Sequence, residues 1–526
     1  MRTDSLWAVR ALRVRTLQPD RPQAECLAVR GGTIVAVGST QEIEALVGPS
    51  ADWLDLRPAA IAPGFSDSHI HLVEWALGRE RPDLAEAGSM SEALARVAEA
   101  ARAVPRDAWL EFKSWNPRWR GESDLAELDE AAAGRAVGLI AHDLHSGWLS
   151  SEAMRRLGVT AERADPAGGF VERGPDGQPT GILKERALNW WYEGRPQPAA
   201  PERREALLGG QAALHAAGVT AVHTVEGPDS FRIVEDLERS GELELRVLHH
   251  MPQRFLSSLI ECGITSGFGG PRLRIGGIKM FTDGALGSRT AWMLEPYEGS
   301  EDRGIRRLSS DELVQDVARA ADAGLASTIH AIGDAAVRMT LDALEAAPAD
   351  GLAVPHRIEH LQCVHPSDLP RAARAGVVAS MQPSHLLTDL PLIEPAWGAE
   401  RARGTFALRS LLDAGTLLAF GSDAPVEAAD PREGFYAAIG RRDREGQPVQ
   451  GWQAEERLTG EEVLEAYTVG PARAAGDASR RGRLAPGFDA DFVAWDIDLA
   501  TAEPDRILSA DVVATFVGGE LVYDQR

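Results

Sequence analysis

Cysteines are scarce and long apolar runs are missing, and both features narrow the classes of protein to which this chain of 526 residues can belong. Only three cysteines occur, Cys26, Cys262 and Cys363, and none forms a Cys-x-x-Cys pair. The sequence therefore indicates neither a disulfide framework nor a cysteine zinc knuckle, and it fits a reducing cytoplasm. No uncharged apolar stretch approaches the ~18 residues that a membrane-spanning helix needs. Residues 1–4 include an acid and begin no apolar run, so we expect no secretory signal.

Clusters of basic residues are missing as well. The chain has 55 lysines and arginines against 79 acids, which gives a formal net charge of -24, and it contains no polybasic run. Nucleic acid and anionic membranes are therefore poor partners. A dispersed acidic surface favours solubility, and the partner that we expect is a small-molecule substrate. A homodimer is the default oligomer, because dimers are the commonest assemblies of soluble chains.

What the sequence does contain is a repeated alternation of apolar helices and short β-rich runs. The β-rich runs occupy residues 219–223, 245–248, 273–279, 326–330, 356–360, 377–381 and 417–420, and one more leads to His69. Strands that alternate with helices predict a parallel sheet. Eight such strands predict an α/β fold of the (β/α)8 TIM-like barrel type, which we assign to residues 61–446.

A long segment interrupts this pattern after the first barrel strand. Residues 75–203 greatly exceed a βα loop of ~2–6 residues, so we expect an inserted α/β subdomain there. The insert holds seven of the 13 tryptophans, at positions 75, 109, 115, 119, 148, 190 and 191. They either fill the insert's own core or form an aromatic lid over the barrel mouth. The second alternative makes Trp115 a substrate contact and favours a substrate with an apolar or aromatic group.

Both ends of the chain are rich in short strands. Residues 26–30 and 33–37, separated by two glycines, predict a hairpin. Residues 491–495, 512–517 and 521–523 indicate further strands. We therefore expect residues 1–60 and 447–526 to form one small β-sandwich domain together.

Potential metal ligands stand at the carboxyl ends of the predicted barrel strands. His69 and His71 are two positions apart on a strand, so their side chains share one face, with Cβ atoms about 6–7 Å apart. Two imidazoles at this spacing can converge on one cation. Active-site residues of such barrels come from the carboxyl ends of the strands. The other ends carry Lys279, His330, His360 and Asp423. We therefore expect all six residues at one mouth of the barrel.

Six motifs point to a known family. They are Pro-Gly-Phe-Ser-Asp-Ser-His-Ile-His (63–71) and the segments 278–290, 329–334, 357–362, 421–426 and 482–492. With them the chain resembles the amidohydrolase superfamily, in particular the YtcJ-like group (amidohydrolase family 3) related to N-substituted formamide deformylase.

This resemblance implies a site for two divalent metals, zinc first, with iron, manganese or nickel as alternatives. His69, His71 and Asp423 would hold one metal, and His330 and His360 the other. A carbamylated Lys279 would bridge them, and an ion pair of Lys279 with Asp283 is the alternative.

The implied activity is hydrolysis of a carbon–nitrogen bond other than a peptide bond. A hydroxide formed between the metals would attack an amide, N-acyl or N-formyl carbonyl, and Asp423 would carry the proton to the leaving amine. A deaminase is the runner-up, although Gly333 stands where such enzymes have a glutamate. A lactonase or cyclic-imide hydrolase needs the same metals. A ligand-binding protein with an inactive site is the alternative from another class.

Further residues near the mouth are candidate substrate contacts: Trp115, His145, Glu185, Asp283, Arg289 and Gln382. The segments around His145 and Glu185 are family-like. Arg289 either clamps a substrate oxygen or ties down its own loop. Glu359, next to His360 on a strand, is expected to face away from the site and to pair with Arg357. An apolar or aromatic N-substituent is the substrate feature that the tryptophans favour.

Overall fold

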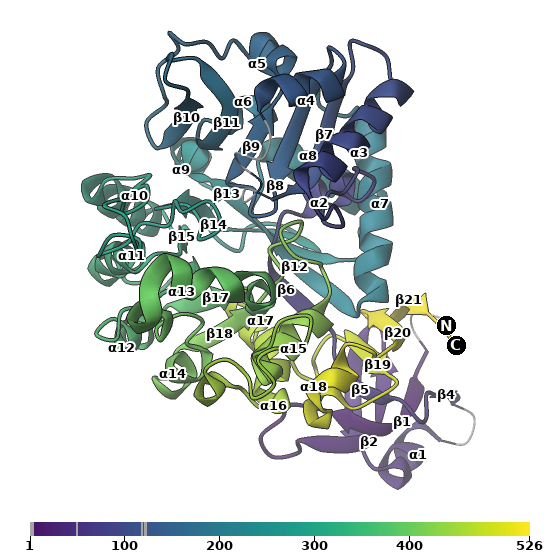
Figure 1. Ribbon diagram of the computed structural model, residues 1–526. Coiled ribbons are helices and arrows are strands. Elements are labelled where there is room, and N and C mark those ends of the chain that lie inside the picture. Colours follow the sequence, from purple (N-terminus) through teal and green to yellow (C-terminus); the bar gives the residue numbers. More distant parts are fainter. Residues whose placement is uncertain (1–4, 49–50, 117–118, 120–123) are drawn as a thin grey trace.

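Three sheets organise the chain (Figure 1). The computed structural model describes residues 5–48, 51–116, 119 and 124–526, so residues 1–4, where we expect no signal, lie outside the described residues. In Figure 1 a parallel barrel occupies the centre, the insert lies above it, and a sheet made from both chain ends lies below. Within the described residues, no helix is long and apolar enough to cross a membrane.

The barrel strands follow one another around the ring in sequence order. They are β6 (Phe65–Ile70), β12 (Val219–Thr224), β13 (Arg246–Pro252), β14 (Leu273–Phe281), β15 (Ala326–Ala331), β16 (Arg357–His360), β17 (Val378–Met381) and β18 (Leu417–Phe420). Neighbouring strands pair in parallel, and a bridge between Ile70 and Ala424 joins the last strand to the first. The predicted barrel fold is confirmed.

Helices cover the outside of the barrel. They are α2 (Leu72–Gly78), α7 (Ala200–Ala216), α8 (Pro228–Ser240), α9 (Leu256–Glu261), α10 (Ser310–Asp322), α11 (Asp334–Ala346), α12 (Leu369–Arg374), α13 (Leu386–Ala402), α14 (Leu408–Asp413), α15 (Pro431–Gly440), α16 (Gly460–Tyr467) and α17 (Val469–Ala474). α10 shows why such helices form. Its first turn is closed by a capping box, in which the side chains of Ser309 and Glu312 each accept the backbone N–H of the other. Its buried residues recur at helical spacing, so one face packs on the barrel.

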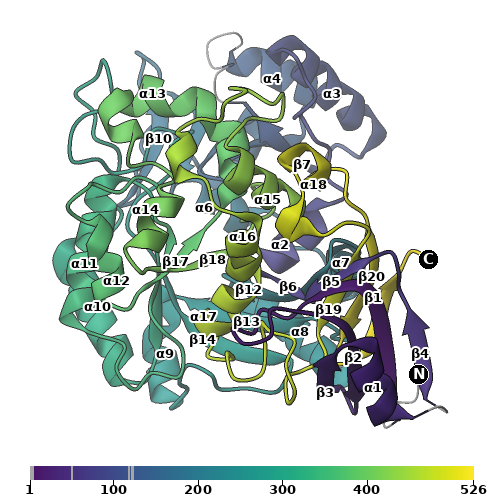
Figure 2. The same ribbon diagram turned by 90° about the horizontal axis from the view of Figure 1, so that it is seen from below.

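The small sheet takes strands from both chain ends, which lie side by side in Figure 2. Its strands are β1 (Trp7–Arg15), β2 (Gln23–Arg30), β3 (Thr33–Gly38), β4 (Asp52–Asp55), β5 (Ala60–Pro63), β19 (Phe492–Trp495), β20 (Val512–Val517) and β21 (Glu520–Asp524). α1 (Thr40–Val47) and α18 (Pro504–Ile507) accompany them. α16 and α17 pack against β18, so the sheet itself uses the C-terminal region only from β19 onward.

The chain passes from the small sheet to the barrel at Gly64. A Cβ atom there would come within 2.4 Å of the Thr220 side chain on β12, so only glycine fits between β5 and β6. This close approach lets the small sheet continue directly into the first barrel strand, whose far end carries His69.

The insert forms its own five-stranded sheet. Its elements are α3 (Met90–Ala103), β7 (Trp109–Trp115), α4 (Leu125–Ala132), β8 (Ala136–Ala141), β9 (Ser146–Leu149), α5 (Ser151–Leu157), β10 (Gly169–Arg173), β11 (Pro179–Glu185) and α6 (Asn189–Gly194). Two apolar clusters fill it, and six of the seven tryptophans lie in or against them. Trp75 packs against a barrel cluster instead. The tryptophans are therefore core residues of the insert and its base.

Candidate active site

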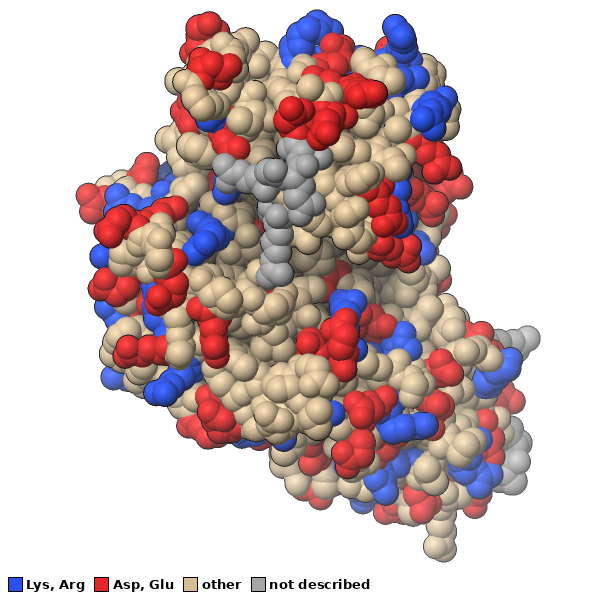
Figure 3. Space-filling view, in the orientation of Figure 1, with Lys and Arg blue, Asp and Glu red and all other residues tan. Residues whose placement is uncertain are grey.

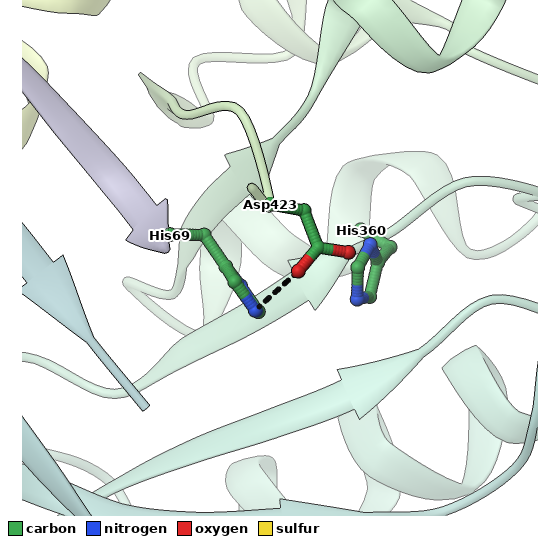
Figure 4. A group of neighbouring side chains, drawn as sticks. All are labelled: His69, His360 and Asp423. Carbon is green, nitrogen blue, oxygen red and sulfur yellow. Dashed lines mark ion pairs between the residues drawn. The ribbon is translucent and has the colours of Figure 1, made fainter. Parts of the chain in front are cut away.

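Three of the predicted ligands form one tight group. His69, His360 and Asp423 each offer an atom within 4.8 Å of the others, and all three residues are buried. Figure 4 shows the Asp423 carboxylate between the two imidazoles. Its Oδ1 lies 3.2 Å from His69 Nε2 and 3.3 Å from His71 Nε2. Imidazoles and a carboxylate arranged in this way suit a divalent cation.

An uncommon backbone conformation places two of these ligands. His360 has a φ of 71° and Asp423 a φ of 57°, both in the left-handed region that residues other than glycine seldom adopt. At His360 this turn ends the alternation of the strand, so that Glu359 and His360 are both buried beside His69. Conformations of this kind persist where the surroundings enforce them, and they cluster at functional sites.

Lys279 and His330 lie beside this group. The Lys279 amine is buried and lacks a hydrogen-bond partner among the described residues. Its Nζ lies 4.5 Å from the ring centroid of Phe281, and burial lowers the pKa of the amine to about 8. The His330 ring lies 4.5 Å from that of His360, and its Nε2 lies 3.0 Å from the carbonyl oxygen of Gly284. This contact orients His330 and leaves Nδ1 for another partner.

A buried ion pair supports His69 from behind. The Glu359 carboxylate accepts from Nε of Arg357, as expected, and it also contacts Nδ1 of His69. Both members of the pair are fully buried. Burial alone would raise the pKa of the Glu359 carboxyl, but Arg357 and His69 hold it well below its usual range. Glu359 therefore directly supports a candidate ligand, a role that the sequence interpretation missed.

A second carboxylate, that of Asp67, links the first barrel strand to the segment that follows the last one. Asp67 Oδ1 accepts from the backbone N–H of His69 at 3.1 Å and from that of Ser422 at 3.0 Å. The backbone N–H of Asp423 in turn donates to the carbonyl oxygen of His69 at 2.7 Å. These bonds set the first and last strands in register, so His69 and Asp423 are held at a constant separation.

A cavity of about 710 Å³ opens between these residues and the insert, a size that suits a small molecule. Its inner wall includes His69, His71, Lys279, His330, His360 and Asp423. Its outer wall includes Ser114, Ile140, Leu144, Leu188 and Tyr192 of the insert. On the face of the molecule in Figure 3, acidic and basic side chains are interspersed over the described residues, without a broad basic patch.

Two of the candidate substrate contacts, His145 and Glu185, reach the cavity. His145 Nδ1 lies 3.0 Å from Glu185 Oε1, and its ring lies 5.4 Å from that of His330. Glu185 also accepts from Thr290 Oγ1 at 2.6 Å and from Arg307 Nη1 at 2.8 Å. Burial opposes ionisation of Glu185, but His145 and Arg307 lower the pKa of its carboxyl to about 2. The insert is thus joined to the wall that carries the ligands.

The other four candidates lie elsewhere, outside the lining of the cavity. Asp283 is buried and accepts the backbone N–H groups of Trp292, Ile332 and Gly333, so it organises a loop. Arg289 is exposed, lies 5.2 Å from the Tyr297 ring and donates to a backbone carbonyl, which matches the loop-tying alternative.

Gln382 is 1% exposed and donates to the carbonyl oxygen of Ser380. Trp115, expected at the substrate, is also 1% exposed and stacks on Trp148 in the insert's core. The ring of Trp115 is therefore buried by packing inside the insert and does not face the cavity.

Comparisons with known proteins bear on the whole chain. The amidohydrolase family matches residues 52–523. Three relatives align along nearly the full length. Protein LONG AFTER FAR-RED 3 of Arabidopsis thaliana is 32% identical, over 95% of this chain and 89% of its own. Putative amidohydrolase YtcJ of Bacillus subtilis is 28% identical, over 97% and 98%. N-substituted formamide deformylase of Arthrobacter pascens is 27% identical, over 97% of each chain.

A solved structure agrees with them. A structure described as an uncharacterized metal-dependent hydrolase from Pyrococcus horikoshii superimposes with a TM-score of 0.77 at 28% identity, over 95% of this chain and 99% of that one. The relatives that the motifs predicted are therefore found.

Proposed function

The chain belongs to the amidohydrolase family, and from that premise we propose that it is a metal-dependent hydrolase of a carbon–nitrogen bond, of amide, N-acyl or N-formyl type, in a small molecule. One observation carries the proposal: histidines, a lysine and an aspartate from the ends of five barrel strands line one wall of a cavity large enough for a small molecule. Relatives named as an amidohydrolase and a formamide deformylase align along the whole chain and favour this type of bond.

The residues present fit divalent metals. Three polar atoms at the site, Lys279 Nζ, His360 Nδ1 and Asp423 Oδ1, are buried without a hydrogen-bond partner among the described residues. Buried polar atoms of this kind normally have partners, and a cation would supply one for His360 Nδ1 and Asp423 Oδ1. We assign one metal to His69, His71 and Asp423 and a second to His330 and His360, with zinc as the first candidate.

Lys279 fits this arrangement as a carbamate. An ammonium group has no lone pair with which to bind a cation, whereas a carbamate offers two oxygens. The alternative partner, Asp283, already accepts three backbone N–H groups. Burial, which favours the neutral amine that reacts with CO₂, supports the modification. We therefore propose that Lys279 is carbamylated and that its carbamate would serve as a ligand to both metals when they are bound.

Asp423 is the residue that we assign to proton transfer. When bound, divalent metals polarise a carbonyl group and lower the pKa of water to about 7. The Asp423 carboxylate is next to His69 and His71 and lines the cavity, where a bound water and a substrate nitrogen would meet it. It accepts a proton from the attacking water and delivers it to the leaving amine. Residues of the insert line the opposite side of the cavity.

Metal analysis combined with a Lys279→Ala variant tests this proposal. We expect the purified protein to contain a divalent metal and to hydrolyse N-formylbenzylamine, and the variant to lose metal and at least about 100-fold in kcat/KM. Lys184→Ala is the matched control, because Lys184 donates to Ser288 of a nearby loop but does not line the cavity. A metal-free protein, or a Lys279→Ala variant with unchanged metal content and rate, contradicts the proposal. An intact mass without the added CO₂ contradicts the carbamate alone.

A further inference from the structure

One arginine inside the cavity was not indicated by any motif. Arg307 follows the loop after β14, lines the cavity, and has a side chain that is only 10% exposed. Its guanidinium lies 4.8 Å from the ring centroid of Phe281, and that ring lies 5.2 Å from the ring of His330. Arg307 therefore stands beside the ligands, on the same wall of the cavity.

The hydrogen bonds of Arg307 are incomplete. A guanidinium carries five N–H groups. Among the described residues, its side chain donates to one acceptor, Oε2 of Glu185, through Nη1. Its Nε is buried and has no partner there, and no acceptor is found for Nη2. Because buried polar groups are normally paired, the remaining N–H groups of Arg307 can donate hydrogen bonds to a ligand in the cavity.

Charge around Arg307 favours an anionic ligand. The Glu185 carboxylate is shared between Arg307, His145 and Thr290, so it compensates Arg307 only in part. Asp283 acts on Arg307 from a distance, and its own hydrogen bonds go to three backbone N–H groups rather than to the guanidinium. A second arginine, Arg186, lines the same cavity and makes no ion pair among the described residues. Two arginines therefore line this corner of the cavity, and of their side chains only that of Arg307 forms an ion pair among the described residues.

We propose that Arg307 binds a carboxylate of the substrate next to the scissile bond, so that N-acyl or N-formyl amino acids are better substrates than simple amides of amines. A carboxylate matches the planar donor face of a guanidinium. The inference rests on the proposed function, because it places the carboxylate relative to the bond that the metal site cleaves.

A matched pair of substrates isolates this contact. N-formylphenylalanine and N-formylphenethylamine differ only in the carboxylate. We expect the wild-type protein to prefer the carboxylate-bearing compound, and Arg307→Gln to lower kcat/KM for that compound about 10- to 150-fold, the effect of one charged hydrogen bond. For the neutral compound, Arg307→Gln should change kcat/KM by less than about threefold. Arg307→Lys should restore part of the preference for the carboxylate, because lysine keeps the positive charge but cannot donate two parallel hydrogen bonds.

Controls separate binding from folding. Arg306→Gln removes the neighbouring arginine, which is exposed and lies over Trp292, and it should leave both substrates unaffected. Metal content and thermal unfolding of each variant show whether it is folded; should Arg307→Gln not fold, Arg307→Lys carries the comparison.

The outcomes also separate this inference from the proposed function. A wild-type protein that hydrolyses the neutral compound as well as the charged one, or an Arg307→Gln variant that lowers both equally, overturns the carboxylate site alone. Hydrolysis of neither compound, nor of N-formylbenzylamine, overturns the proposed function.

Discussion

Replacing Glu359 by glutamine should weaken metal binding although no ligand is altered. Both oxygens of the Glu359 carboxylate accept hydrogen bonds, one from Nδ1 of His69 and one from Nε of Arg357. The proton of His69 is thereby kept on Nδ1, and the lone pair of Nε2 is directed toward Asp423. Glutamine offers one oxygen and one NH₂ group. If the NH₂ group faces His69, Nδ1 has to accept, the proton moves to Nε2, and His69 no longer binds a cation.

The size of the effect follows from the burial of these groups. Partners that orient a ligating histidine change metal affinity by about 10–100-fold. Arg357 and Glu359 are both fully buried, and breaking such a pair costs about 3–5 kcal/mol of stability. Glutamine keeps one of the two hydrogen bonds, so we expect a loss near the lower end, about 3 kcal/mol.

Two measurements on the same samples check this reasoning. Competition with a chromogenic chelator gives the metal dissociation constant, and urea unfolding of the metal-free protein gives the change in stability. Glu345→Gln is the matched control, since Glu345 pairs with Arg371 at the surface, where ion pairs contribute about 0–1 kcal/mol. If Glu359→Gln binds metal as tightly as the wild-type protein, Glu359 does not position His69 and the argument is wrong.

Two further predictions concern stability. A Cβ atom at Gly138 would lie 2.6 Å from Trp191, so Gly138→Ala should cost about 1–3 kcal/mol in urea unfolding. Trp191→Phe shortens that ring and removes its 2.6 Å hydrogen bond to Glu111. The double variant should lose less unfolding free energy than the sum of the two single variants, because the smaller ring relieves the clash. Additive losses would contradict the contact. Removing metal with a chelator should lower the midpoint of thermal unfolding, and zinc at 100 times its dissociation constant should restore about 2.7 kcal/mol. An unchanged midpoint would argue against a metal in the folded protein.

The barrel and its strand ends could be predicted because they depend on local patterns. Short β-rich runs separated by helices identified all eight strands, and the residues at their carboxyl ends include those that gather around Asp423. Because side chains alternate along a strand, we also predicted that Glu359 faces away from the site. That step failed, because the left-handed backbone of His360 ends the alternation one residue early. A backbone torsion of this kind has no signal in the sequence.

Long-range packing explains the rest of the differences. Tryptophan content alone does not distinguish a lid from a core, and Trp115 and Trp191 turned out to be buried in the insert. Arg289 stands in a motif and Arg307 does not, yet Arg307 is the one that lines the cavity. The fold of the loop around Asp283 decides which of the two lines the cavity. Asp283 joins this loop to Ile332 and Gly333, which lie 49 and 50 residues further along the chain.

The contact between Glu185 and Arg307 joins the insert to the wall of the cavity that carries the proposed metal ligands. Glu185, at the end of β11 with a φ of 52°, joins His145 of the insert to Thr290 and Arg307 of the barrel loop. Buried charge-assisted hydrogen bonds of this kind hold geometry tightly, because breaking them leaves an uncompensated charge. A substrate held by Arg307 is therefore positioned by the same residues that hold the insert in place. Changes in the insert that move Glu185 should then alter selectivity among substrates before they alter the metal site, since the ligands themselves come from the barrel strands.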